Sequence, residues 1–392
     1  MRNILQNYAA NENNSNWNNI IKREKQLYKR NNDIRSDFER DYTRIIHSTA
    51  YRRLKHKTQV FFMPENDHIC TRIEHVVLVE SISYTIAKYL GLNTELTKAI
   101  ATAHDIGHSP FGHMGERILS EISMNDIGER FWHEKNGLDM VDKIELLEDP
   151  EGNKQNLNLT YAVRDGIISH CGEIDENMLK PREEVIDLKE YKTPNQYSPY
   201  TWEGCVVKIA DKISYLGRDI ADAITLGVLD GHLTELYDIL KFNGKIINNT
   251  VLTNHMIYDL CENSNPEQGL CFSPETFKLI NDIKKFNYKN IYLTDKKMSS
   301  MEYIRFVLTG LYNALKDSYK NREKAEELYP ELMKDFENFL NDYWNLERKI
   351  NNKNDILFNM ENEKDYYRAI IYYISGMTDN YAIKMFNKII GF

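Results

Sequence analysis

Apolar residues recur along most of this 392-residue chain at the three- and four-residue spacing of an α-helix. The clearest example is the segment 72–90, which stops at Gly91, a residue type that readily ends a helix. A second periodic segment begins after Asn93 or Thr94, either of which can cap it, and ends at His104 and Asp105, before a run of helix breakers. Both segments are predicted to be helices with one buried face.

Two further stretches show the same periodicity. Residues 41–54 predict one helix, and residues 200–226 predict a longer one. Within the longer helix, Asp211, Tyr215 and Asp219 are four residues apart, so they are expected to line a common face as a polar column.

Composition supports a helical fold. The 18 glycines and 9 prolines fall well below average usage, so the chain lacks the turn residues that all-β folds need. The first 19 residues are rich in asparagine and are expected to form a loose lead-in. We therefore predict an all-α protein whose helical core carries additional N- and C-terminal helices.

Charge and cysteine content exclude several classes of protein. The net charge is -9 and the basic residues are dispersed, which argues against sequence-independent binding of duplex nucleic acid as the main activity. The five cysteines are widely spaced and contain no Cys-x-x-Cys pair, so neither a disulfide framework nor a cysteine-rich zinc site is indicated. Without a long apolar run near the start or elsewhere, the protein is expected to be cytoplasmic and to have no membrane partner.

Histidine is the most informative residue type in the chain. Eight of the eleven histidines lie between residues 47 and 133, a density that chance explains poorly. His104 and Asp105 are adjacent and would point about 100° apart on a regular helix, so both can reach one ion only near a helix end. His75 from one helix and Asp211 from another would complete a mixed nitrogen and oxygen set. The sequence therefore predicts a metal site at which phosphate oxygens are polarised and water is activated.

The chain resembles the HD-domain deoxynucleoside triphosphate triphosphohydrolases, the bacterial dGTPase-like family. The matching segments are residues 45–48, 52–54, 56–60, 71–75, 104–113, 115–116 and 374–379. The resemblance extends over nearly the whole chain and is densest between residues 40 and 135. It implies an HD-domain core at residues 41–235 after a lead-in at 1–40. Residues 236–392 are then expected to form a helical extension that packs on the core and completes the nucleotide pocket.

The resemblance also implies roles for single residues. His75, His104, Asp105 and Asp211 match the family's ligands for a divalent ion, which could be Mn, Mg, Fe, Ni, Co or Zn. His113 matches the catalytic histidine, and Glu116 matches its acidic partner. Because they are three positions apart, the two side chains would share one helix face if the segment is helical, and the carboxylate could then orient the imidazole.

Further matches concern the substrate. His108 and His133 match active-site histidines that contact phosphates or the attacking water. Arg72 and Lys212 match cations that bind the triphosphate. The groups that match contacts around the deoxyribose 3′-hydroxyl are Gln59, Tyr215 and Asp219.

The chain departs from the family pattern at two places. Glu134 follows His133 where the family usually has asparagine, and Arg218 precedes Asp219 where many relatives have histidine. A basic cluster of Arg52, Arg53 and Lys57 could be surface charge or a second nucleotide site at a subunit boundary.

The activity that the resemblance implies is metal-dependent hydrolysis of dGTP or several dNTPs to deoxynucleoside and tripolyphosphate, by attack at the α-phosphorus. It also implies a homo-oligomer, often a hexamer, with activation by nucleotides or single-stranded nucleic acid. The residues leave two alternatives open. One is another HD-superfamily nucleotide phosphohydrolase or phosphodiesterase, and the other is a nucleotide-sensing or single-stranded-DNA-binding protein without catalysis.

Overall fold

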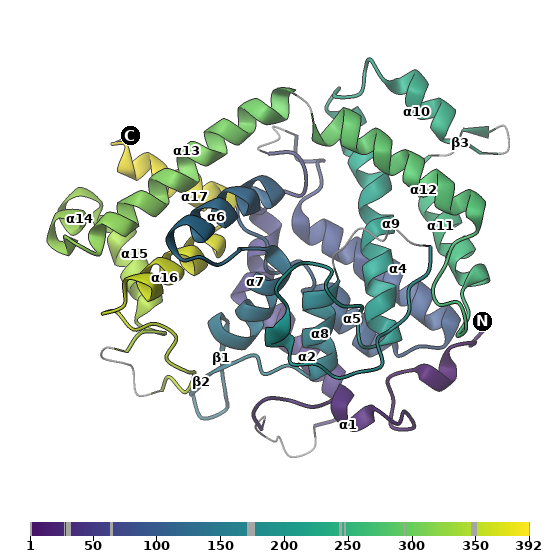
Figure 1. The fold of residues 1–392 in the computed structure, drawn as a ribbon, viewed down its shortest axis with the longest axis horizontal. Helices are drawn as coiled ribbons and strands as arrows, with labels where there is room; N and C mark the ends of the chain where they lie inside the picture. Colours follow the sequence, from purple (N-terminus) through teal and green to yellow (C-terminus); the bar gives the residue numbers. More distant parts are fainter. Residues whose placement is uncertain are drawn as a thin grey trace.

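A computed structural model describes residues 2–26, 28, 33–62, 66–170, 177–242, 245–246, 248–293, 295–345 and 351–391. Helices form nearly all of the regular structure in these ranges (Figure 1), so the prediction of an all-α fold is confirmed. No helix within the described ranges combines the length and apolar character needed to cross a bilayer.

The helices follow one another along the chain with only short strands between them. They are α1 (Trp17–Ile20), α2 (Asp37–His47), α3 (Thr49–Arg53), α4 (Arg72–Leu90), α5 (Thr94–Ala103), α6 (Gly112–Asp126), α7 (His133–Asp139), α8 (Tyr161–Ser169), α9 (Trp202–Thr225), α10 (Leu233–Ile239), α11 (Asn249–Asn263), α12 (Pro274–Asn287), α13 (Asp295–Ser318), α14 (Arg322–Leu328), α15 (Pro330–Leu340), α16 (Glu363–Ser375) and α17 (Asp379–Ile389). Short 3-10 helices are η1 (Gln6–Tyr8), η2 (Leu54–His56) and η4 (Leu188–Glu190), and π-helical turns are η3 (Met140–Ile144) and η5 (Tyr288–Tyr292).

Two small antiparallel hairpins interrupt the helices. The first pairs β1 (Leu146–Glu148) with β2 (Lys154–Asn156), and the second pairs β3 (Lys241–Phe242) with β4 (Lys245–Ile246). In the first hairpin, Leu147 lies opposite Gln155.

The three helices expected to carry the site form where the periodicity placed them. Helix α4 begins at Arg72 and ends before Gly91, whose φ of 84° is the left-handed conformation that glycine adopts without strain. Asn93 caps α5, because its side-chain oxygen accepts hydrogen bonds from the backbone amides of Glu95 and Leu96. Helix α9 covers nearly all of the predicted segment 200–226.

Two predictions about the N-terminal part were wrong. Residues 41–54 do not form one helix, because α2 already begins at Asp37 and Ser48 interrupts the chain to cap α3. The first 19 residues are not a loose lead-in either. Leu5 is fully buried, and the carboxylate of Glu203 accepts hydrogen bonds at 2.9 Å from the backbone amides of Ala10 and Asn93.

The buried apolar residues form two separate clusters, which we call the first core and the second core. The first core joins α2, α4, α5, α8, α9, α11 and α12 through residues such as Ile45, Val79, Ile100, Val163, Ile209, Met256 and Ile283. The second core joins α6 to α13, α15, α16 and α17 through residues such as Phe111, Ile118, Leu311, Phe336, Ile370 and Phe386. The C-terminal helices therefore pack against α6, a helix from the first third of the chain.

The domain boundary at residue 235 remains a prediction, although apolar packing runs across it. Helices α11 and α12 follow that boundary yet belong to the first core with α4 and α9. Residues 111–144 precede it and belong largely to the second core.

The chain crosses from the first core to the second at Phe111, which has a φ of 64°. Asp379, at the start of α17, accepts a hydrogen bond from the Phe111 amide at 2.9 Å and another from the Thr58 amide at 2.9 Å. Lys57 donates to the carbonyl oxygen of Ser375 at 3.0 Å and also to that of His108. The C-terminal segment thus holds the loop around residue 58 and the turn at residue 111 in place.

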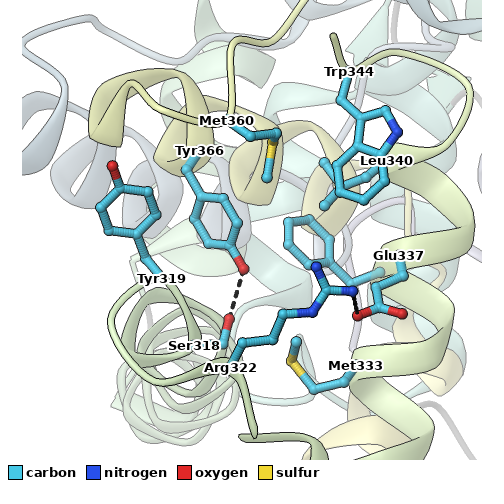
Figure 2. A pocket seen from close by; sticks show the side chains of 10 residues that line it. Ser318, Tyr319, Arg322, Met333, Glu337, Leu340, Trp344, Met360 and Tyr366 are labelled. Carbon is cyan, nitrogen blue, oxygen red and sulfur yellow. Dashed lines mark hydrogen bonds and ion pairs between the residues drawn. The ribbon is translucent and has the colours of Figure 1, made fainter. Parts of the chain in front are cut away.

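The second core contains a small cavity of about 170 Å³ (Figure 2). In it the hydroxyls of Ser318 and Tyr366 are 2.6 Å apart, and Arg322 pairs with Glu337. None of the residues predicted for the functional site lines this cavity.

The cysteines within the described ranges are free and buried, namely Cys70, Cys205, Cys261 and Cys271. This agrees with the expectation that the chain has no disulfide framework; Cys171 lies outside the described residues.

Candidate functional site

Four residues from three segments of the first core converge on one point. His75 lies in the first turn of α4, His104 and Asp105 directly follow α5, and Asp211 lies in the middle of α9. The Nε2 atom of His75 is 2.9 Å from Oδ1 of Asp211 and 3.8 Å from Oδ2 of Asp105. The Nε2 atom of His104 is 3.5 Å from Oδ1 of Asp105 and 3.8 Å from Oδ1 of Asp211. The structure therefore brings together the four predicted ligands, which we call the ligand cluster.

The two imidazoles of the ligand cluster are oriented by contacts on their far sides. His104 donates from Nδ1 to the carbonyl oxygen of Ala101 at 2.7 Å, and Nδ1 of His75 is 3.3 Å from the hydroxyl of Ser214. This leaves Nε2 of His104 buried, without a hydrogen-bond partner and close to two carboxylates. A buried orphan nitrogen beside acidic oxygens is the arrangement that a divalent cation satisfies.

The charges in the ligand cluster shift one another's pKa values. Burial acts to raise the pKa of Asp105, but His104, His108 and Arg72 together hold it well below its usual range. Burial likewise opposes ionisation of Asp211, yet its hydrogen bond to His75 lowers the pKa of the carboxyl. Both carboxylates are thus kept in the ionised form that binds metals.

Arg72 lies inside this network rather than in open solvent. Its Nη1 is 2.6 Å from Oδ2 of Asp105, and its Nη2 donates to the carbonyl oxygens of Thr58 and Gln59 at 3.2 and 3.3 Å. The guanidinium therefore holds Asp105 in place and ties it to the loop at residues 58–59. Its Nε atom is buried and makes no hydrogen bond.

A second group of residues lies beside the ligand cluster and comes from α6 and α7. Glu116 accepts hydrogen bonds at 3.1 Å from Nδ1 of His113 and from Nδ1 of His133, and a third from the His133 amide at 3.1 Å. The rings of His133 and His108 are stacked with centroids 3.8 Å apart. We call His108, His113, Glu116 and His133 the histidine–glutamate cluster. All four were predicted site residues.

Gly107 allows these helices to approach each other. A Cβ atom at this position would lie 2.1 Å from the carbonyl oxygen of His133 and 2.1 Å from the amide nitrogen of Gly137. Only glycine fits there, so the glycine between Asp105 and His108 positions α7 against the ligand cluster.

The two clusters are in contact through His108, whose Nε2 is 3.1 Å from Oδ1 of Asp105. Burial, Arg72 and His133 lower the pKa of His108 well below its usual range, so its ring stays neutral. Burial acts to raise the pKa of Glu116, but His133 and His113 hold it well below its usual range. Glu116 is therefore an ionised acceptor for both histidines.

The residues predicted to contact the sugar lie along α9 and on the loop before α4. The Oε1 atom of Gln59 is buried and makes no hydrogen bond. Asp219 accepts a hydrogen bond from the hydroxyl of Tyr292 at 2.5 Å, and Tyr215 is half-buried one turn before it. Lys212 is buried next to Asp211. The predicted polar column thus exists, and Tyr292 from η5 joins it.

Sequence reasoning assigned no role to three residues of this region, namely His170, Tyr292 and Asp379, and it left open the role of Lys57, which is buried. The ring of His170 lies 5.0 Å from that of His104 and 5.4 Å from that of His133. Burial, His104 and His133 lower the pKa of His170 to about 3. His170 stands alone after an apolar helix, outside the dense run of histidines, so no spacing pattern could have marked it.

The basic residues near position 55 do not form one cluster. Arg53 is 2.6 Å from Glu145 and Arg52 is exposed, whereas Lys57 is buried. Arg52 and Arg53 line a cavity of about 920 Å³ with Lys154, four tyrosines and other residues.

Glu134, the departure from the family pattern, is buried beside the histidine–glutamate cluster. Its Oε2 lies 3.2 Å from Nδ1 of His133, and neither of its carboxylate oxygens makes a hydrogen bond. It gives His133 a second carboxylate neighbour in addition to Glu116.

Comparison with known proteins agrees with this geometry. The HD domain family model matches residues 72–216, which contain the ligand cluster and the histidine–glutamate cluster, and the phosphohydrolase-associated domain matches residues 316–388. The chain is 33% identical to a deoxyguanosinetriphosphate triphosphohydrolase-like protein of Caldanaerobacter subterraneus over 91% of this chain and 86% of the relative.

Two other relatives bear the same name. The protein of Rickettsia bellii is 31% identical over 91% of this chain and 92% of the relative. The protein of Pelagibacter ubique is 33% identical over 93% of this chain and 97% of the relative. Because the similarity runs through nearly the full length of these relatives and includes the HD domain, the chain belongs to the HD-domain family of deoxyguanosinetriphosphate triphosphohydrolase-like proteins.

Proposed function

We propose that the protein hydrolyses dGTP or several dNTPs to a deoxynucleoside and tripolyphosphate. The observation that carries this proposal is the contact between the ligand cluster and the histidine–glutamate cluster, made by His108 and Asp105 at 3.1 Å. A metal site alone fits many phosphohydrolases. A histidine–carboxylate pair beside that site adds a proton donor, and the names of the relatives favour a nucleoside triphosphate as the substrate.

The ligand cluster would hold a divalent cation through His75, His104, Asp105 and Asp211. When bound there, such an ion supplies Lewis-acid polarisation of a phosphate oxygen and lowers the pKa of a water molecule. The donor set has two nitrogens and two carboxylates, so it accommodates several first-row metals and Mg²⁺.

His113 is proposed as the general acid. With Nδ1 donating to Glu116, its Nε2 is the ring nitrogen that can carry a proton toward a substrate. As the water oxygen bonds to the α-phosphorus, the bond from phosphorus to the 5′-oxygen breaks and that oxygen takes the proton from His113. The water gives up a proton to solvent, and His113 is reprotonated from solvent before the next turnover. Glu116 fixes the ring and stabilises its positive charge.

Binding of the substrate is proposed to use the residues around these clusters. The unsatisfied Nε of Arg72 and the ammonium of Lys212 would offset triphosphate charge. The unsatisfied Oε1 of Gln59 would accept a hydrogen bond from the 3′-hydroxyl, and Tyr215 and Asp219 would pack against the sugar. Such close packing would exclude a ribose 2′-hydroxyl, since that group would clash or lose its hydrogen bonds.

Product analysis tests the proposal. The purified protein is incubated with each dNTP and Mn²⁺ or Mg²⁺ in ¹⁸O-labelled water, and the products are separated. Deoxynucleoside and tripolyphosphate carrying the label are expected. Deoxynucleoside monophosphate with pyrophosphate would refute the assignment of the cleaved bond, and nucleotide binding without turnover would favour a sensing protein.

A homo-oligomer activated by a nucleotide or by single-stranded nucleic acid forms part of the proposal. The cavity lined by Arg52, Arg53 and Lys154 supports a second anion site, because it offers basic groups beside aromatic rings. Light scattering in the presence and absence of dNTPs and oligonucleotides gives the subunit number and its dependence on these ligands.

A further inference from the structure

The histidine–glutamate cluster has the composition of a metal site in its own right. One ligand atom from each of His108, His113, Glu116 and His133 can be chosen so that all four lie within 4.8 Å of one another. Three imidazoles with one carboxylate form a donor set that is typical of Zn²⁺ and contains one carboxylate fewer than the ligand cluster.

The distances around Glu116 fit a tetrahedral ion. Zinc bonds of about 2.0–2.1 Å place neighbouring ligand atoms about 3.4 Å apart. The Oε2 atom of Glu116 lies 3.1 Å from Nδ1 of His113 and 3.1 Å from Nδ1 of His133. A small outward relaxation of these contacts would therefore admit an ion between them.

His108 supplies an independent indication of a ligand. Its side chain is 2% exposed, its Nε2 faces Asp105, and its Nδ1 is buried without any hydrogen-bond partner. His133 stacks on this ring with centroids 3.8 Å apart, which places a second imidazole beside the unsatisfied nitrogen. An unsatisfied nitrogen of this kind is costly in a protein interior unless something binds it.

His113, the fourth member of the histidine–glutamate cluster, can adjust its position. The side chain of His113 is 73% exposed, while those of His108 and His133 are 2% and 6% exposed. Because most of the His113 side chain is exposed to solvent, its ring can close onto an ion that the other three residues bind.

From these observations we propose that His108, His113, Glu116 and His133 form a second metal site, selective for Zn²⁺ and similar nitrogen-preferring ions, whose occupation inhibits the enzyme. The inhibitory part rests on the proposed function. A metal ion bound to Nδ1 of His113 takes the place of the proton shared with Glu116, so the ring can no longer become the imidazolium that donates from Nε2. The protein would therefore need one ion in the ligand cluster and be inhibited by a second ion nearby.

Metal stoichiometry tests the site without relying on turnover. The full-length protein and its variants are dialysed against buffered Zn²⁺, and bound zinc is measured by elemental analysis. Two zinc ions per chain are expected for the wild type. One is expected for His113→Asn and for Glu116→Gln, and one for Asp211→Asn, which weakens the ligand cluster instead.

A matched control comes from α10 and the residue before it. His232 and Glu235 have the same three-residue spacing as His113 and Glu116, and their nearest atoms are 4.0 Å apart, with no further histidine in a described metal-ligating group. His232→Asn should keep both zinc ions. A wild-type chain that binds a single zinc ion, or His113→Asn and Glu116→Gln variants that both bind two, would overturn the second site.

Turnover gives the second readout. The dNTP hydrolysis rate of the wild type should rise to a maximum near one equivalent of Zn²⁺ and fall roughly a hundredfold as the second equivalent binds, because general-acid catalysis is lost. A rate that stays at its maximum with two ions bound would overturn the inhibitory part. A chain that hydrolyses no dNTP would overturn the proposed function but not the second site, for which the stoichiometry alone decides.

Discussion

The ligand cluster and the histidine–glutamate cluster adjoin each other but are held very differently. In the ligand cluster, the side chains of His75, His104 and Asp105 are at most 5% exposed. Each makes a further contact, respectively with Ser214, with the carbonyl oxygen of Ala101 and with Arg72. His113 instead lies on α6, which packs on the second core, and its ring is mostly exposed.

This difference in burial fits the two chemical roles proposed for the clusters, which are metal binding and proton donation. Ligands to a bound ion must keep their geometry before the ion arrives, since two carboxylates this close repel each other in its absence. A proton donor has to meet a substrate that enters and leaves, which requires a ring able to move. The seam between the two cores thus joins a rigid half of the site to an adjustable half.

Removing a ligand from the rigid half should have the largest effect. Asp105→Asn removes an anionic ligand and the partner of Arg72, so kcat/KM should fall by roughly 10⁴-fold, because bound metal contributes several kcal/mol of transition-state stabilisation. The rise in Tm that Mn²⁺ gives the wild type should also disappear. His232→Asn should leave both properties unchanged. If Asp105→Asn retained the Mn²⁺-dependent rise in Tm, the ligand assignment would be wrong.

His170, which lies beside the ligand cluster, should make the unfolding free energy depend on pH. The pKa of His170 is lowered from 6.5 to about 3 by burial, His104 and His133, so the unfolded chain takes up this proton at a higher pH than the folded chain. The stability that comes from keeping His170 neutral is fully present above pH 6.5. As the pH falls from 6.5 toward 3, the unfolding free energy should decrease by up to roughly 4 kcal/mol for this reason.

Urea denaturation of metal-free protein across this range measures the effect. His170→Gln should flatten the dependence of the unfolding free energy on pH, whatever its stability at neutral pH. Equal slopes for the variant and the wild type would show that His170 does not contribute.

Changing His113 in the adjustable half should affect catalysis without affecting stability. His113→Asn should lower kcat by roughly a hundredfold to a thousandfold, the usual contribution of a general acid, while KM and Tm change little because the ring is exposed. Glu116→Gln should have a similar effect on kcat. The double variant should lose little more than either single variant, since the pair acts as a unit; additive losses would contradict the pairing.

The smallest of these effects is expected where the two cores meet, at the contacts of Asp379 with Phe111 and Thr58. The two carboxylate oxygens of Asp379 accept hydrogen bonds from the backbone amides of Phe111 and Thr58. Asp379→Asn replaces one of these oxygens with an amide group, so the unfolding free energy should fall by about 1–3 kcal/mol. Asp282→Asn removes an exposed ion pair with Lys278 and should cost less than about 0.5 kcal/mol. Chemical denaturation of both variants gives the comparison, and equal losses of unfolding free energy would mean that Asp379 does not stabilise the contact between the two cores.

Much of the first core was predictable because its signals are local. The three- and four-residue spacing placed α4, α5 and α9, and the residue types at Gly91 and Asn93 marked where helices end and begin. The four ligand positions were predicted from their residue types and from the resemblance to the HD-domain family, and periodicity only assigned them to helices or helix ends. Their roles, and those of the substrate residues, remain predictions.

Other features could not be read from local patterns. Lys57 resembled surface charge, but its partner is the carbonyl of Ser375, 318 residues away. Leu5 lies in a polar, asparagine-rich segment and is nevertheless fully buried. Both depend on contacts between distant parts of the chain, which periodicity does not report.

By itself, the amino-acid sequence determined an all-α fold and the helices that carry the predicted ligands, because helix periodicity and side-chain chemistry are local properties. Only the tertiary structure decided that two cores meet at the site, that His170 and Tyr292 join it, and that Asp379 ties the C-terminal helices to it. These depend on which apolar faces pack together, and that choice is made by the whole chain at once.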